Sequence, residues 1–167
     1  SSGRPISGRP FSCAHPAILP SMAARPKNTP DTQHTRQQVG QLVRQGRHAE
    51  ALALLERALK RDPKNATLCT LIATVLAAVG EPARAAVYLE RAVLARPTDP
   101  AVRAGLAEQL LHAGQTDASQ RVALKLMTMG PAAAAYAGMI STLLLSSARH
   151  ESALSLAGWA HEQASDD

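Results

Sequence analysis

Cysteine and histidine are the residues of this sequence that could hold a metal ion or act as nucleophiles. The chain has two cysteines, Cys13 and Cys69, and six scattered histidines. The cysteines do not form a Cys-x-x-Cys pair, and no two histidines have ligand spacing within one predicted helix. Cys69 falls at a helix-packing position, so we expect a buried thiol rather than a disulfide. The sequence therefore predicts no metal site and no cofactor.

Catalytic motifs are the next class to consider. The segments GRHAEA and GEPARA begin with glycine, but both lack the preceding strand and the lysine of a phosphate-binding loop. No serine lies in a nucleophile-elbow context. His48 and His150 fall at equivalent positions near the start of a predicted helix, where a packing role is expected. These patterns indicate that the chain is not an enzyme.

A period of 34 residues organises the elements that carry these side chains. It appears in the spacing of three glycines and of three prolines: Gly46, Gly80 and Gly114, then Pro63, Pro97 and Pro131. A fixed period of this length is typical of a solenoid built from helical pairs.

One period can be interpreted residue by residue. The segment LCTLIATVLAAVG is apolar on nearly every face, as expected for a helix buried between two neighbours. Gly80 then closes that helix, because glycine enters the left-handed conformation without a side-chain clash. Pro82 is tolerated in the first turn of the second helix, which stops at Pro97. Each period is thus predicted to be helix, tight turn, helix, proline.

These residues resemble the tetratricopeptide repeat, whose 34-residue unit has small residues where its two helices cross. The glycines match its turn position. Small residues match its two crossing positions, with Leu126 departing from the second one: Ala51, Ala85, Ser119 and Ala153, then Ala58, Ala92 and Ala160. One core position of the first helix, which the family fills with a large residue, is leucine in all four repeats: Leu42, Leu76, Leu110 and Leu144. In the last unit, Ala148 replaces the glycine and Ser165 replaces the proline.

The resemblance implies an all-α fold, a right-handed α-solenoid of four helix-turn-helix repeats with eight antiparallel helices. The expected repeats are 32–65, 66–99, 100–133 and 134–167. Residues 1–31 contain six prolines, which disfavour both helix and packed strand, and we expect this segment to be disordered. It has no apolar core of the length that a secretory signal needs, so a cytoplasmic location is expected. A transit peptide, and a true start at Met22, remain alternatives.

Charge and hydropathy bear on nucleic-acid and membrane binding. The formal net charge is +5, and much of the excess lies in residues 1–31, with no basic stripe interleaved with aromatics. We therefore expect no nucleic-acid binding. Residues 126–148 carry no charge, but Gly130 and Pro131 divide them at a repeat boundary, so we expect no membrane segment.

The resemblance also implies that the first helix of each repeat lines a concave groove in which peptides dock. The positions expected to face it are Gln33, Arg36, Val43, Arg44, Thr67, Thr70, Thr74, Ala77, Ala104, Glu108, Leu111, His112, Gly138, Thr142 and Leu145. The carboxylate clamp of chaperone-binding members is not matched, since its positions hold Arg36, Gly40, Leu71, Ala101 and Gly105. The asparagine ladder of other members is not matched either, since its positions hold Gln37, Leu71, Gly105 and Met139.

The sequence thus predicts a protein–protein interaction scaffold that binds a peptide or helix of another protein. The peptide is expected to be mostly apolar except near Arg36 and Arg44. The last helix carries Leu154, Leu156 and Trp159 with no repeat after it, so weak self-association through the fourth repeat is expected. The alternative is the N-terminal repeat region of a larger enzyme, of glycosyltransferase or sulfotransferase type, with its catalytic part beyond residue 167.

Overall fold

The computed structural model describes residues 30–165, and regular structure within that range is helical throughout. The expected disordered segment 1–31 lies outside the described residues except for Pro30 and Asp31. These two residues belong to the first helix, which therefore begins two positions earlier than the sequence suggested.

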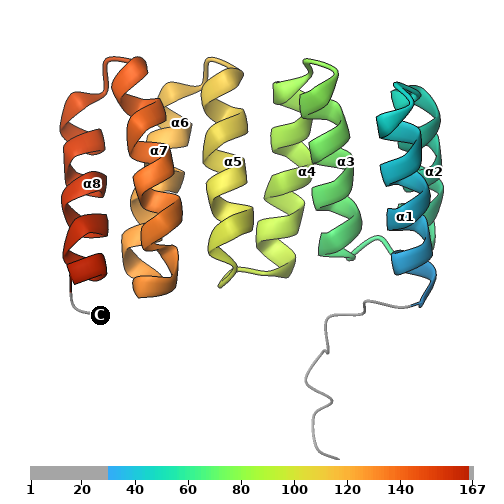
Figure 1. Ribbon diagram of the computed structural model, residues 1–167, viewed down its shortest axis with the longest axis horizontal. Coiled ribbons are helices and arrows are strands. Elements are labelled where there is room, and N and C mark those ends of the chain that lie inside the picture. The colour runs from blue at the N-terminus through green and yellow to red at the C-terminus, as the bar shows by residue number, and fades with distance from the viewer. Residues whose placement is uncertain (1–29, 166–167) are drawn as a thin grey trace, which may run out of the picture.

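Within residues 30–165, eight α-helices pack as successive antiparallel pairs, with α1 and α2 at one end of the stack and α7 and α8 at the other (Figure 1). Their bounds are α1 Pro30–Arg44, α2 His48–Arg61, α3 Ala66–Ala78, α4 Pro82–Ala95, α5 Pro100–His112, α6 Thr116–Leu124, α7 Ala134–Ser146 and α8 His150–Ser165. Two short 3-10 helices lie between α6 and α7: η1 Lys125–Thr128 and η2 Pro131–Ala133. The all-α repeat solenoid expected from the 34-residue period is confirmed.

The turn inside each helical pair has one residue in the left-handed conformation. In the third of these turns, for example, the amide of Gln115 donates to the carbonyl of Leu110 over 2.8 Å, which satisfies an orphan carbonyl at the end of α5. In the turns within the four pairs, these residues are Gly46 (φ 73°), Gly80 (φ 79°), Gly114 (φ 75°) and Ala148 (φ 58°). The conformation that glycine favours is therefore kept in the last repeat, where the sequence has alanine.

Polar side chains cap the starts of α3 and α5, and a proline follows the cap of α5. The Asn65 side chain accepts a hydrogen bond from the amide of Leu68 over 3.2 Å and caps α3. Asp99 caps α5 by accepting from the amide of Ala101 over 3.1 Å. Pro100 occupies the first turn of α5, where its missing amide hydrogen costs nothing.

Small residues lie where the two helices of each pair cross. Ser119 is the polar member of the set, and its hydroxyl donates to the carbonyl of Ala107 over 2.6 Å, so the buried hydroxyl of Ser119 is satisfied. The four residues at the first crossing position are completely buried: Ala51, Ala85, Ser119 and Ala153. This burial explains why the sequence keeps these side chains small.

The third repeat (100–133) departs from the predicted continuous second helix. Helix α6 ends at Leu124 and the chain tightens into η1, after which Gly130 takes a φ of 78° before η2. Leu126 is fully buried at the crossing position that Ala92 fills in the preceding repeat. The larger side chain does not fit a close helix crossing, and the 3-10 turn accommodates it.

The core consists of two adjoining clusters rather than one uniform seam. Val102, Leu106 and Leu110 of α5 belong to the cluster on the α1 side, whereas Ala107 of the same helix belongs to the cluster on the α8 side. Val122 packs against both clusters. Helix α5 is therefore the element that joins the two halves of the solenoid.

Within residues 30–165, no helix combines the length and apolarity needed to cross a membrane. The uncharged stretch 126–148 is divided among η1, η2 and α7, as the glycine-proline pair at its centre suggested.

Candidate functional site

The candidate site lies on the first helices α1, α3, α5 and α7, on the side that the sequence assigned to the groove. We call this surface the first-helix face. The residues predicted to form it divide by exposure. Exposed are Gln33, Arg36, Arg44, Thr74, His112, Thr142 and Leu145, and half-buried are Val43, Thr67, Thr70, Ala77, Glu108, Leu111 and Gly138.

One residue proposed for this face was placed wrongly. Ala104 is 1% exposed and belongs to the core cluster on the α8 side. Its neighbours Val102, Leu106 and Ala107 are buried as well, because α5 is packed between α4 and the helices that follow it.

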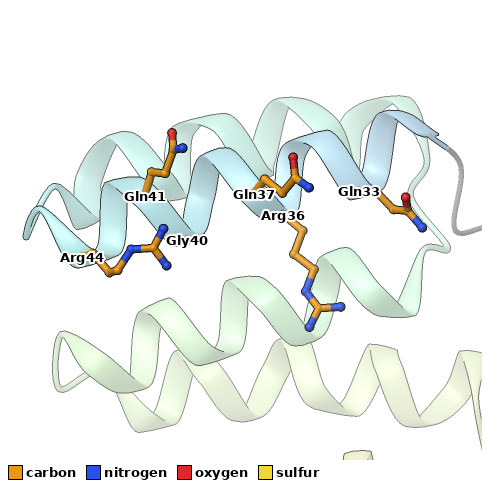
Figure 2. Close-up of a pocket in the computed structure, with 6 residues that line it drawn as sticks. All are labelled: Gln33, Arg36, Gln37, Gly40, Gln41 and Arg44. Carbon is orange, nitrogen blue, oxygen red and sulfur yellow. The ribbon is translucent and has the colours of Figure 1, made fainter.

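An open hollow of about 560 Å³ lies along α1. It is lined by residues at helical spacings of three and four, so they share one face: Gln33, Arg36, Gln37, Gly40, Gln41 and Arg44. Figure 2 shows these side chains along the helix, with Arg36 extending toward the next first helix, α3. The sequence identified Gln33, Arg36 and Arg44 as groove residues and missed Gln41, although its spacing from Gln33 and Gln37 would have included it.

The hollow is cationic. Its lining contains two guanidinium groups, three carboxamides and no carboxylate. Neither Arg36 nor Arg44 has a hydrogen bond or ion pair with another residue in the range 30–165. A β-carbon built at Gly40 would lie 3.8 Å from a guanidinium nitrogen of Arg44, so the Arg44 side chain lies beside the helix at Gly40 (Figure 2).

The part of the first-helix face on α3 has a different chemistry. The hydroxyl of Thr70 donates to the carbonyl of Ala66 over 2.6 Å, and that of Thr74 donates to Thr70 over 2.9 Å. Thr67 accepts a hydrogen bond from the guanidinium of Arg96. Because the hydroxyl protons of Thr70 and Thr74 are used by their own helix, these two threonines offer methyl groups and spare acceptor lone pairs to a ligand.

Helices α5 and α7 continue this weakly polar surface. Glu108 and His112 lie one helical turn apart, with 3.8 Å between carboxylate oxygen and ring nitrogen. The hydroxyl of Thr142 donates to the carbonyl of Met139 over 2.7 Å. Met139 and Leu145 are 45% and 42% exposed, which leaves apolar surface on α7.

The titratable side chains of residues 30–165 do not form a metal-binding site. Residues 30–165 contain no group of three or more His, Cys, Asp or Glu side chains close enough to share an ion. Cys69 is a free, buried cysteine, and burial raises the pKa of its thiol. The ring nitrogen Nδ1 of His48 is buried and has no hydrogen-bond partner within the described range.

Comparison with known proteins gives a family match and several structural matches. A family model described as "Tetratricopeptide repeat" matches residues 42–86 and 76–143. No curated protein matches the chain.

Among solved structures, the chain is similar to MamA with a TM-score of 0.66 at 15% identity, over 80% of this chain and 73% of that one. Residues 41 to the end of MamA from Desulfovibrio magneticus RS-1 give a TM-score of 0.65 at 18% identity, over 81% and 76% of the two chains. YrrB, described as "a TPR protein with an unusual peptide-binding site", gives 0.62 at 22% identity, over 77% and 66%. Likenesses at this level of identity establish the fold.

Proposed function

The chain belongs to the tetratricopeptide-repeat family, and we propose that it is a protein-interaction scaffold whose first-helix face binds a peptide or helix of a partner protein. Repeat solenoids of this kind present extended surfaces for binding, and fold alone does not name the partner. The proposal therefore rests on the chemistry of the face itself.

The open hollow on α1 is the observation that carries the proposal. Within residues 30–165, the side chains of its two arginines and three glutamines make no hydrogen bond or ion pair with another residue. Arg36 extends toward α3, and α1 and α3 are in contact, so the hollow and the threonine surface of α3 form one face (Figure 2). YrrB, a protein of the same fold, is described as having a peptide-binding site, which supports the proposal by analogy.

The face changes character along the solenoid. Beyond α1 it offers the methyl groups of Thr70 and Thr74, then the half-buried Leu111 and the exposed Leu145. An occupant of this part is expected to be apolar, and its binding should vary weakly with salt because little fixed charge is present.

A pair of matched variants tests the proposal. Peptides selected from a random display library on the full chain are titrated against Thr74→Arg and Ser155→Arg. Both hydroxyls are exposed and donate to the carbonyl four residues earlier over 2.9 Å, but Thr74 lies on α3 and Ser155 on α8. We expect Thr74→Arg to weaken binding about tenfold or more, because an arginine on this face blocks the occupant.

Ser155→Arg is expected to bind like the parent chain, and both variants are expected to melt like it. Equal affinity of the parent and Thr74→Arg for the selected peptides would overturn the assignment of the face.

A further inference from the structure

We propose that the exposed side of the second helices is a docking surface for an anionic lipid bilayer, on which Val87 and Leu94 enter the headgroup region and nearby cations contact the lipid headgroups. The proposal goes beyond the proposed function, because it uses α2, α4 and α6 rather than the first-helix face, and it needs no spanning helix. We call this surface the second-helix patch. Besides Val87 and Leu94 it contains five exposed cations: Arg57, Lys60, Arg91, Arg121 and Lys125.

The 34-residue period places the patch residues at equivalent positions of three successive repeats. Arg57, Arg91 and Lys125 are 34 residues apart, and all three are exposed, including Lys125 in η1. On each second helix, the positions four residues before and three residues after lie on the same stripe, because i, i+4 and i+7 share one face. All nine residues at these positions are exposed and none is acidic. The period therefore gives three neighbouring stripes that together carry five cations.

A contact between repeats shows that these stripes adjoin. The guanidinium of Arg91 donates to the carbonyl of Pro63, just after α2, over 3.1 Å, and lies 5.6 Å from the centre of the Tyr88 ring. Arg91 thus reaches from α4 toward the cations of α2. Glu56 and Glu90 border the patch, each about 100° around its helix from the next residue, an arginine. Neither glutamate forms an ion pair within residues 30–165.

The centre of the patch is apolar, which distinguishes it from an ordinary solvated cationic face. Leu94 is 83% exposed and Val87 is 56% exposed, and Arg91 lies one helical turn from each of them. Leu94 is the most exposed large hydrophobic residue within 30–165. Both apolar residues lie on α4, the second helix of the middle repeat of the three, so cations on both neighbouring repeats flank them. This apolar surface gains free energy by leaving water.

Charge complementarity favours a bilayer as the occupant. A cluster of about four to eight Lys or Arg side chains is typical of surfaces that recognise anionic lipids, and each cation near such a leaflet favours binding about fivefold. Helices that lie on bilayers combine these cations with apolar residues, as the patch does. The long Lys and Arg stems let the charges reach headgroups while the apolar side chains enter between them.

A nucleic acid or an acidic protein fits the patch less well. Lipid headgroups diffuse to cations spread over three helices, whereas a protein partner must match them at fixed positions. Binding of single-stranded nucleic acid uses exposed aromatic rings for base stacking, and the aromatic residue nearest the patch centre, Tyr88, is half-buried beside Arg91. Binding of either competitor is therefore an outcome that contradicts the proposal.

The test is sedimentation of the full chain with sucrose-loaded vesicles at physiological ionic strength. One preparation is phosphatidylcholine with about one-third phosphatidylserine, and the other is phosphatidylcholine alone. We expect binding to the anionic vesicles and binding about tenfold weaker or less to the neutral ones. Equal binding to the two preparations, or binding to neither, would overturn the proposal.

Two pairs of exposed arginines compare position at the same change in net charge. Arg57→Gln/Arg121→Gln removes two patch cations on α2 and α6, and we expect it to lower the affinity for anionic vesicles about tenfold or more. Arg36→Gln/Arg44→Gln removes two cations on α1, and its affinity for the vesicles should stay within about threefold of the parent. Equal losses in the two pairs would show that net charge controls adsorption and would overturn the proposal.

Leu94→Ser tests the apolar centre of the patch and should lower the affinity for anionic vesicles several-fold. Leu154→Ser is the matched control, because Leu154 is 67% exposed but lies on α8, and it should bind vesicles like the parent. All of these variants should melt like the parent chain, since the altered side chains are exposed. Unchanged vesicle affinity of Leu94→Ser would contradict insertion of the apolar centre.

A uridine decamer and a glutamate decamer, added as competitors, separate a bilayer from other polyanions. We expect neither to displace the chain from anionic vesicles when its total charge matches that of the exposed lipid. Displacement by either competitor would overturn the proposal. Failure here is separable from failure of the proposed function, because peptides selected for the first-helix face should bind Arg57→Gln/Arg121→Gln as they bind the parent.

Discussion

Ala148 shows at the scale of a single residue how the last repeat departs from the others. It holds a φ of 58°, whereas the equivalent turn positions in the first three repeats are glycines. A left-handed conformation brings the β-carbon of an L-residue close to backbone carbonyl oxygen, which glycine avoids. The fold therefore imposes this conformation on a residue that disfavours it.

We expect Ala148→Gly to stabilise the chain by about 1 kcal/mol and Gly114→Ala to destabilise it by a similar amount. The Gly114 variant is a matched control, because a β-carbon there meets no atom within 4 Å and only the backbone conformation changes. Chemical denaturation measures both. Loss of stability in Ala148→Gly would mean that the turn does not hold the left-handed conformation in solution.

Cys69 is the residue whose ionisation should be visible in the stability of the chain. Burial raises the pKa of its thiol above the value in the unfolded chain, so the folded state favours the neutral form. The stability that this contributes is present below the unfolded pKa and is lost as pH rises through the folded one. Compared with Cys69→Ala, the parent chain should lose more stability between neutral pH and about pH 10. Parallel pH profiles for the two proteins would contradict this.

At the scale of elements, the third repeat has a large side chain at the crossing position where the second repeat has a small one. Ala92 and Leu126 occupy the same crossing position in successive repeats, and both are fully buried. The continuous helix α4 needs the small residue, whereas the 3-10 turn after α6 encloses the large one.

Ala92→Leu should therefore cost about 1–3 kcal/mol through overpacking. Leu126→Ala should cost about 2–5 kcal/mol, because it leaves a cavity in the core cluster on the α8 side. Denaturant melts of the two variants test the pair. If Leu126→Ala instead stabilised the chain, the result would contradict this account, because it would mean that Leu126 strains the 3-10 turn and that alanine relieves the strain.

The sequence predicted the helical pairs, the glycine turns and the small residues of the first crossing position, which are buried, because each is set by local spacing that recurs every 34 residues. It did not predict the break after Leu124, since the effect of Leu126 depends on the helices packed around it. For the site, residue types identified Arg36, Arg44 and the threonines of α3. The burial of Ala104 depended on how closely α5 packs, which one sequence does not reveal.

At the scale of the whole molecule, the two ends of the solenoid differ. The α1 end presents a charged and carboxamide-rich surface. On α8, Leu154 is 67% exposed, and Trp159 is partly buried against the core cluster on the α8 side. We therefore expect that any self-association of the chain uses this apolar end.

We expect weak self-association that depends on protein concentration and is lost in Leu154→Glu. Sedimentation across a range of concentrations measures it, and Leu94→Glu is the control, because Leu94 is 83% exposed but lies on α4. Monomeric behaviour of the parent chain at all concentrations would contradict association through α8.

The central claim is that partners bind on the first-helix face, and mapping of amide chemical shifts by NMR tests it most directly. A display-selected peptide is added to the isotope-labelled full chain, and the shifted amides are assigned to helices. The account predicts that the shifts concentrate on α1, α3, α5 and α7, with Arg36, Thr70 and Thr74 among the affected positions. Shifts concentrated on α2, α4, α6 and α8, with the first helices unchanged, would contradict it.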